Sequence, residues 1–230
     1  KTLFPYTTLF RSWPKPGQDF TDEVVLDAKL AHHLRVRRYQ LNETFKVFDG
    51  KGLSANACLT VMDKKSAAVR LSEIQENLRT ETKVPITLAQ GIAGGDKMDW
   101  LIEKSVELGI SHVIPLHTER SVVRLDGERA AKKQTHWEGI LIAASEQSGR
   151  TVLPSIEAVQ NIPLWLSSLN PHDNSLRIML SPRAESSLLS VVKRCTPQAL
   201  TILIGPEGGL SDSEEEQAKR AGFTPVSMGQ

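Results

Sequence analysis

From residue 84 onward, apolar runs alternate with amphipathic segments, and this alternation restricts the possible folds more than any other feature of the chain. The runs PITLAQGI, SHVIPLHTER, LRIMLSPRA and ALTILIG are typical of buried strands. Between the first two lies DKMDWLIEKSVELG, where Met98, Leu101, Ile102 and Val106 share one helical face and Gly109 is a natural stop. Such alternation predicts a parallel sheet with helices on both faces, and ligands of such sheets bind at the carboxyl ends of the strands.

The remaining helices can be placed by the same signals. A long helix is expected over GERAAKKQTHWEGILIAASEQSGR, ending near Gly149, and shorter helices at NIPLWLSSL and in ESSLLSVVKRC. Ser211 and Glu214 have the spacing of a capping box, and Gly222 closes the helix that they begin. The last stretch, FTPVSMGQ, predicts a strand that runs into a glycine turn.

Residues 13–83 have a different pattern, with the short β-like runs FKVFDG, LSANACLTVM and SAAVRLSEI separated by turn sequences such as Asp49-Gly50. They predict a small β-barrel. Residues 1–12, KTLFPYTTLFRS, repeat Thr-Leu-Phe and look like translated sequencing-adapter sequence. Pro5 interrupts their apolar stretch and no small-residue cleavage site follows, so they do not read as a signal peptide. We expect a non-native leader outside the fold.

Charge is unevenly distributed along the 230 residues, although the net charge is only +1. Residues 1–83 carry 14 Lys and Arg against 10 Asp and Glu, a net charge of +4, and the rest of the chain carries −3. Five basic side chains crowd into the stretch LAHHLRVRRYQ: His32, His33, Arg35, Arg37 and Arg38. The imbalance indicates an anionic partner for the front part.

Other composition features exclude several classes of protein. No apolar run approaches the roughly 18–20 residues of a membrane span. Cys58 and Cys195 are far apart and lack metal-ligand spacing, which indicates reduced thiols of a cytoplasmic protein. The six His show no ligand grouping, so we expect no metal site.

The stretch LIGPEGGLSDSE places a glycine loop, residues 205–209, between a strand and a helix. Helix N-termini attract anions, but Glu207 would repel a phosphate and the spacing matches neither a P-loop nor a dinucleotide fingerprint. A neutral or cationic ligand fits better. Bare Gly208 and Gly209 would let backbone groups approach an adenine edge, while Glu207 suits a positive or donor-rich neighbour. The alternative is a tight turn that only closes the connection, and the local pattern favours neither.

Three polar clusters occupy predicted ends of strands or helices. They are Glu119, Arg120 and Arg124 in HTERSVVR, Glu146, Gln147 and Arg150 in SEQSGR, and Arg183 in SPRA. In a parallel sheet the first cluster, the third cluster and the glycine loop would emerge on one rim, and the long helix would have to bring Arg150 to the same side. Each cluster taken singly could also be a solvated surface.

These motifs together resemble the RsmE family, the small-subunit ribosomal RNA uridine-N3 methyltransferases of the SPOUT superfamily. The resemblance spans about residues 13–230 and rests on LAQGIAGGDKMDWLIEKSVELGISHVIPLHTERSVV, AASEQSGR, SPRA and LIGPEGGLSDSE in that order. It implies an α/β protein with a PUA-like RNA-binding barrel over residues 13–83, which includes HHLRVRR. It also implies a parallel α/β methyltransferase domain over residues 84–230 with a deep trefoil knot, a rare exception to unknotted folds.

The resemblance further implies S-adenosyl-L-methionine as cofactor and methylation of N3 of one uridine in 16S ribosomal RNA. The implied cofactor-binding residues are Leu180, Gly205, Pro206, Glu207, Gly208, Gly209, Met228 and Gly229. For catalysis we expect Arg120 and Arg150 to stabilise the base or a phosphate and Glu146 to accept the proton, since arginine stays protonated. The expected RNA contacts are His32, His33, Arg35, Arg37, Arg38 and Arg124. The partner would be ribosomal RNA or the small subunit, and the full-length protein a homodimer.

The chain departs from the family pattern after residue 229. The family continues there with a Leu-Arg-x-Glu-Thr-Ala segment and a final helix, which complete the knot. We therefore expect the chain as given to bind cofactor weakly and to lack activity, and its full-length parent to be the enzyme. The alternatives are a non-catalytic RNA-binding protein that uses the basic barrel only, or an α/β enzyme that uses another nucleotide.

Overall fold

The computed structural model describes residues 6–9, 23–26, 28–64, 66–78, 81–171, 173–193 and 196–228. Contacts divide the chain into two units, Lys1–Glu81 with Ser145–Leu153, and Thr82–Ala144 with Pro154–Gln230. The division after Glu81 falls close to the boundary expected between residues 83 and 84. The grouping of Ser145–Leu153 with the N-terminal unit has no counterpart in the sequence pattern.

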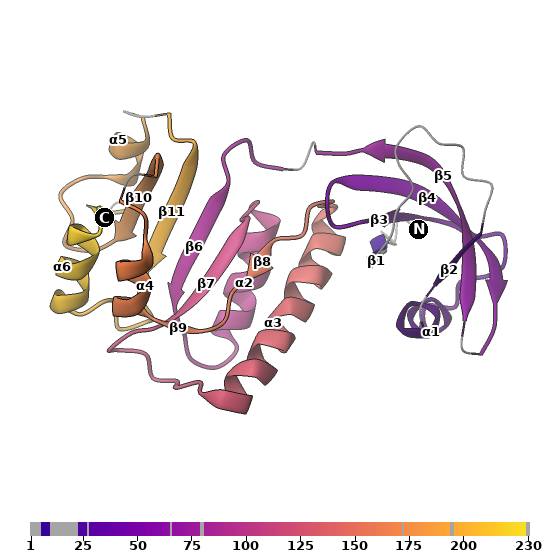
Figure 1. Ribbon diagram of the computed structural model, residues 1–230, viewed down its shortest axis with the longest axis horizontal. Coiled ribbons are helices and arrows are strands. Elements are labelled where there is room, and N and C mark those ends of the chain that lie inside the picture. Colours follow the sequence, from indigo (N-terminus) through magenta and orange to yellow (C-terminus); the bar gives the residue numbers. More distant parts are fainter. Residues whose placement is uncertain are drawn as a thin grey trace. The chain divides into compact units, whose positions relative to one another are not determined.

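The N-terminal unit is built on a five-stranded sheet with one helix (Figure 1). Its elements are β1 (Tyr6–Leu9), β2 (Glu23–Leu26), α1 (Ala28–Val36), β3 (Thr44–Phe48), β4 (Leu53–Met62) and β5 (Ala67–Glu76). The strand order is β1-β3-β4-β5-β2, and all neighbours are antiparallel except the parallel pair β1 and β3. The three strands predicted between residues 44 and 76 are therefore confirmed.

Three features of this unit differ from the expectation. Tyr6–Leu9 pair with β3 as an edge strand, although residues 1–12 were expected to lie outside the fold. The stretch LAHHLRV belongs to α1, a helix that was not expected from the sequence. No pairing joins β1 to β2 within the described residues, so the unit is an open, mainly antiparallel sheet there, and closure into a barrel stays a prediction.

The core of the N-terminal unit lies between α1 and the inner face of the sheet. Leu34 of α1, Phe45 of β3 and Leu59 of β4 are almost completely buried. In β3 buried and exposed residues alternate over the first four positions, as a strand with one solvated face requires. The segment Ser145–Leu153 joins this unit through backbone hydrogen bonds to the turn between β3 and β4, with Gly52 N donating to Thr151 O at 3.1 Å.

The C-terminal unit is a seven-stranded, entirely parallel sheet with helices in its connections. Its elements are β6 (Ile86–Gly91), α2 (Lys97–Glu107), β7 (His112–His117), α3 (Gly127–Ser148), β8 (Ser155–Ile156), β9 (Gln160–Asn161), α4 (Ile162–Ser168), β10 (Ser175–Leu180), α5 (Leu188–Val192), β11 (Ala199–Ile204), α6 (Asp212–Arg220) and β12 (Thr224–Val226). The order is β12-β10-β11-β6-β7-β8, and β9 pairs with β7. The predicted parallel α/β architecture is confirmed.

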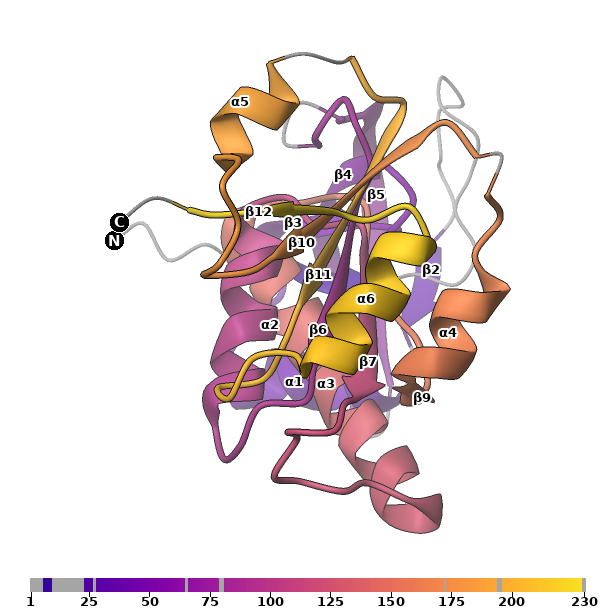
Figure 2. The same cartoon turned by 90° about the vertical axis from the view of Figure 1, so that its left-hand side faces the viewer.

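Helices cover both faces of this sheet, with α2 on one side of the strands and α4 and α6 on the other (Figure 2). On the first face Met98, Ile102 and Val106 of α2 are fully buried, as the predicted helical face requires, in a core that also contains Trp137 of α3. On the second face Trp165 of α4 packs in a core with Ala218 of α6 and with residues of β10 and β11. This two-sided burial leaves the ends of the strands as the place for a ligand.

The predicted helix ends are also observed. Gly109 follows α2 with φ of 96° and Gly149 follows α3 with φ of 75°, a left-handed conformation that glycine adopts without strain. Ser211 and Glu214 form both hydrogen bonds of the capping box at the start of α6. No helix in the described ranges is long and apolar enough to span a membrane.

Candidate functional site

A cavity of about 780 Å³ opens at the carboxyl ends of β10, β11 and β12 in the C-terminal unit. Its walls are the glycine loop after β11, the residues that follow β10 and β12, and Arg120 from the loop after β7. Seven of the eight residues predicted to bind a cofactor line it: Leu180, Gly205, Pro206, Glu207, Gly208, Gly209 and Met228. The eighth, Gly229, lies outside the described residues.

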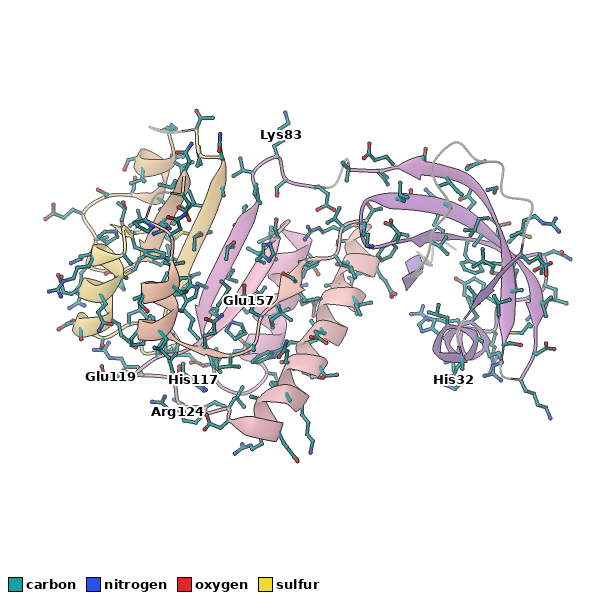
Figure 3. The ribbon with its side chains drawn as sticks, in the orientation of Figure 1. His32, Lys83, His117, Glu119, Arg124 and Glu157 are labelled. Carbon is teal, nitrogen blue, oxygen red and sulfur yellow. The ribbon has the colours of Figure 1, made fainter. Side chains whose placement is uncertain are left out.

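The expected convergence of two polar clusters with the glycine loop is observed. Arg120 and Arg183 both line the cavity together with residues 205–209. Glu119 and Arg124 flank this position in the same loop, and they lie with His117 at the end of the sheet opposite Lys83, which precedes β6 (Figure 3). Parallel strands bring the residues that follow them to one edge, and the cavity lies at that edge.

The glycines of the loop are required first by the packing of the loop on itself. A Cβ on Gly205 would lie 2.5 Å from the carbonyl carbon of Gly209, and a Cβ on Gly91 would lie 2.6 Å from Cδ of Pro206. Gly209 has φ of 70°, and its N–H donates to Pro206 O at 2.8 Å to close the turn. The tight turn and the cavity wall are therefore one and the same structure, so the two alternatives open in the sequence are compatible.

Glu207 finds its positive and donor-rich neighbour within the protein. Its Oε1 accepts hydrogen bonds from Lys97 Nζ at 2.9 Å and from Gly94 N at 3.1 Å. The hydrogen bond from Lys97 is the main cause that lowers the pKa of Glu207 below its ordinary value, assisted by backbone N–H groups including that of Gly94. The glutamate thus fastens the glycine loop to the start of α2.

Two further side chains hold the backbone of the loop. Arg120 Nη1 donates to Gly208 O at 2.8 Å, and the Arg120 side chain lies over Gly208, so that a Cβ there would be 3.3 Å from Cβ of Arg120. The buried side chain of Gln90 also holds the loop, because its Nε2 donates to Gly205 O at 3.0 Å. The sequence does not identify Gln90 as a site residue, although a polar residue within the apolar run PITLAQGI is a signal that could have found it.

The cavity also contains a carboxylate that the sequence analysis does not single out, that of Glu215 on α6. Glu215 is 9% exposed and its Oε1 accepts hydrogen bonds from Ser181 Oγ at 3.2 Å. Arg183 Nη2 lies 3.2 Å from the same oxygen and 2.6 Å from Oδ1 of Asp212. These carboxylates raise the pKa of Arg183 and fix its guanidinium at the cavity edge.

Glu146 and Arg150 are not among the residues that line this cavity, and both belong to the N-terminal unit. Arg150 is 3% exposed and its Nη2 donates to Glu81 Oε2 at 2.5 Å. Burial raises the pKa of Glu146 to about 7, against the opposing effect of the positive charge of Arg37. Their catalytic roles stay predictions, and the observed ion pair gives Arg150 a structural role in any case.

The predicted RNA-binding stretch occupies α1 and the turn that follows it. His32, Arg37 and Arg38 are exposed. Arg35 is half-buried and donates to the backbone carbonyls of Ala31 and Lys64. The pKa of His33 is lowered by burial first and then by the charges of Arg37 and His32. The sixth residue, Arg124, belongs to the C-terminal unit, where it is exposed in the loop after β7.

Comparisons with known families match both units. A family model described as RNA methyltransferase domain matches residues 80–230, and one described as RNA methyltransferase PUA domain matches residues 26–72. The chain is 31% identical over 192 residues to ribosomal RNA small subunit methyltransferase E of Bacillus subtilis, covering 81% of this chain and 74% of that protein. It is 32% identical over 198 residues to the protein of the same name from Aquifex aeolicus, covering 84% and 80%.

Solved structures give the same result. The chain resembles a ribosomal RNA small subunit methyltransferase E from Neisseria gonorrhoeae bound to S-adenosyl methionine, with a TM-score of 0.83, 34% identity and coverage of 95% of this chain and 88% of that one. It also resembles a Legionella pneumophila protein in complex with the bound cofactor SAM, with a TM-score of 0.82, 31% identity and coverage of 94% and 87%.

Proposed function

Because this chain belongs to the RsmE family of ribosomal RNA small subunit methyltransferases, we propose that it methylates N3 of one uridine in 16S ribosomal RNA with S-adenosyl-L-methionine as methyl donor. The observation that carries the proposal is the cavity of about 780 Å³ whose walls are the glycine loop and the carboxyl ends of β10, β11 and β12. Its volume is within the roughly 300–1,000 Å³ of small-molecule sites.

The residues that line the cavity suit this cofactor. Leu180, Ile204, Val226 and Met228 offer apolar surface for an adenine ring, and residues 205–209 offer main chain beside it. When bound, the cofactor supplies a methyl group on a positively charged sulfur. We propose that Leu180, residues 205–209, Met228 and Gly229 hold it.

Arg120 is placed to act on the RNA base beside the cavity. N3–H of uridine lies on the pairing edge, so the base has to be unpaired and turned outward to react. The N3 proton has to leave as the N–C bond forms, and negative charge develops on the base. We propose that the exposed Arg120 guanidinium stabilises this charge.

Glu146 is the proposed proton acceptor, and its pKa of about 7 suits a general base at neutral pH. Arg150 is the second proposed stabiliser of the base or a phosphate. Its buried ion pair with Glu81 holds the segment Ser145–Leu153 that also carries Glu146. Replacing Arg150 should therefore affect stability as well as rate.

The N-terminal unit is proposed to bind the RNA as a PUA-like domain. Its basic residues on α1, together with Arg124 of the C-terminal unit, would contact phosphates, whose binding weakens steeply as salt increases. R37A with R38A should lower RNA affinity and flatten its salt dependence, which a filter-binding titration measures. An unchanged affinity and slope would make this stretch an ordinary solvated surface.

Three finer statements belong to the same proposal. We propose for the C-terminal unit the deep trefoil knot that the resemblance to the family implies. We also propose a cytoplasmic homodimer. Stretching the C-terminal unit by its ends in an optical trap tests the knot, because a knotted chain stays shorter than its full contour length at high force.

Isothermal titration with S-adenosylmethionine and methyl transfer to small-subunit RNA test the function together. For a chain completed by the family's C-terminal segment we expect binding, and transfer of one methyl to a uridine identified by mass spectrometry of the digested RNA. RNA binding without heat from the cofactor would favour a non-catalytic RNA-binding protein. Binding of ATP or NAD in place of the cofactor would favour another nucleotide-using enzyme.

A further inference from the structure

One buried carboxylate, that of Glu214, joins the start of α6 to the turn after β7. Glu214 is 5% exposed. Its Oε2 accepts a hydrogen bond from Ser211 N at 2.9 Å, which closes the capping box, and its Oε1 accepts a hydrogen bond from Glu119 N at 2.8 Å. A capping box needs only one carboxylate oxygen. The second bond is therefore a contact of another kind, between residues 95 positions apart.

The contact is made at the residue that precedes Arg120. β7 ends at His117, and the chain then forms a tight turn in which Ser121 N donates to Thr118 O at 3.2 Å. Arg120 is the residue of this turn that reaches the glycine loop, by its hydrogen bond to Gly208 O. Glu214 thus holds the backbone of the turn at Glu119, next to Arg120, in addition to the hydrogen bonds between Thr118 and Ser121 within the turn.

We infer that Glu214 is a positioning residue, which places Arg120 over the glycine loop by holding the Glu119 N–H. The inference rests on the proposed function, in which Arg120 stabilises the reacting base. A charged acceptor makes a stronger hydrogen bond to a backbone N–H than a neutral one. Because the carboxylate is buried, losing either donor would leave an oxygen unpaired, which keeps both contacts in place.

Two variants separate this role from simple helix capping. In E214Q the side chain keeps one acceptor oxygen and gains a donor NH₂, so it cannot accept from Ser211 N and Glu119 N together. In S211A the hydroxyl that accepts from Glu214 N at 3.3 Å is lost, but both carboxylate contacts remain. S211A weakens the cap alone, whereas E214Q has to give up one of the two contacts. Because Gln also serves in a capping box, the contact to Glu119 is the one that we expect to be lost.

Amide hydrogen exchange at Glu119 tests the contact without any activity. We expect exchange at Glu119 to become at least about tenfold faster in E214Q and to change by less than about twofold in S211A. Equal protection of Glu119 in the wild type and in E214Q would overturn the inference. This measurement remains decisive even if the protein transfers no methyl group, in which case only the proposed function fails.

Methyl transfer to small-subunit RNA then tests the action through Arg120. E214Q should lower kcat/KM by about tenfold. In the R120A background the same change should lower kcat/KM by less than about twofold, because the side chain that Glu214 positions is then absent. S211A should keep its kcat/KM at temperatures below its transition. Losses that multiply in the double variant, or an equal loss in S211A, would make Glu214 a structural residue only.

Discussion

At the scale of single residues, the glycine loop shows how one short segment meets two requirements. Gly205 and Gly91 are needed because the loop closes on itself and on the end of β6, where a Cβ would overlap backbone atoms. At Gly208 the fit is less strict, since a Cβ there would lie 3.3 Å from Cβ of Arg120. The segment is thus a closed turn, and its outer side is at the same time a wall of the cavity.

Replacing Gly205 with Ala should therefore damage both stability and the cofactor site. The new Cβ would lie 2.5 Å from the Gly209 carbonyl carbon, so the loop has to open. We expect a loss of about 1–3 kcal/mol in the free energy of unfolding and roughly tenfold weaker S-adenosylmethionine binding, measured by urea titration and calorimetry.

Gly139→Ala is the matched control for this change. Gly139 lies within α3 and has open space around its Cα, so the substitution should stabilise the protein by about 0.5–1 kcal/mol through helix propensity. Similar behaviour of G205A and G139A would contradict the close packing of the loop.

The raised pKa of Glu146 predicts how the stability of the protein depends on pH. Its pKa is raised from 4.5 to about 7, mainly by burial, so folding favours the neutral acid. Its contribution to stability is complete below pH 4.5 and is lost as the pH rises through about 7. The Tm of E146Q minus that of the wild type should increase across this window and level off above it, whereas E138Q on the exposed side of α3 is the control. A flat difference would mean that Glu146 is charged throughout.

At the scale of elements, long-range polar contacts hold helices against the sheet, whereas the local sequence pattern predicts only where these helices begin and end. Arg177 of β10 is 7% exposed, and its Nη1 donates to Ala221 O at the end of α6 while its Nη2 donates to Asn170 O just beyond α4. A positive charge at two helix C-termini is favourable because both ends carry unpaired carbonyls. One side chain thus joins two helices to the sheet.

R177M should lower the free energy of unfolding by roughly 2–4 kcal/mol, since it removes the hydrogen bonds to Ala221 O and Asn170 O and the ion pair with Asp173. R220M, in the last turn of the same α6 but exposed, should cost less than about 1 kcal/mol. Urea unfolding followed by tryptophan fluorescence measures both. If the two substitutions lower the free energy of unfolding equally, the contacts of Arg177 do not hold these two helices to the sheet.

At the scale of the whole molecule, the chain consists of two units with separate cores and different chemistry. The N-terminal unit carries the basic helix α1, and the C-terminal unit carries the cavity. A ligand stabilises the part of a protein to which it binds. The cofactor should therefore stabilise the C-terminal unit, whereas the RNA should also stabilise the N-terminal unit, which carries five of the six proposed RNA-contacting residues.

Scanning calorimetry should distinguish the effects of the two ligands on the two units. S-adenosylmethionine at about a hundred times its Kd should add about 2.7 kcal/mol to the stability of the unit that contains the cavity, and a small-subunit RNA fragment should raise the transition of the N-terminal unit. ATP and NAD serve as controls that should move neither transition. A cofactor effect on the N-terminal unit alone would contradict the location of the site.

Much of this protein can be read from local sequence. The alternation of apolar and amphipathic runs determined the parallel α/β unit, and Gly109, Gly149 and the pair Ser211 and Glu214 marked the helix ends. These signals depend on neighbours within about one helical turn or on the two-residue period of a strand, so they are visible without the fold. The loop 205–209 was assigned as a site only through the family resemblance, because its local pattern favoured neither a ligand wall nor a plain turn.

Only the tertiary structure decided which distant groups meet. The contacts of Glu207 with Lys97 and of Glu214 with Glu119 join residues 110 and 95 positions apart, and no local pattern predicts them. The grouping of Ser145–Leu153 with the N-terminal unit likewise has no counterpart in the local sequence. The physical reason is that every buried polar group needs a hydrogen-bonding partner, but strand order and packing determine which group that partner is. The neighbouring residues in sequence do not contain this information.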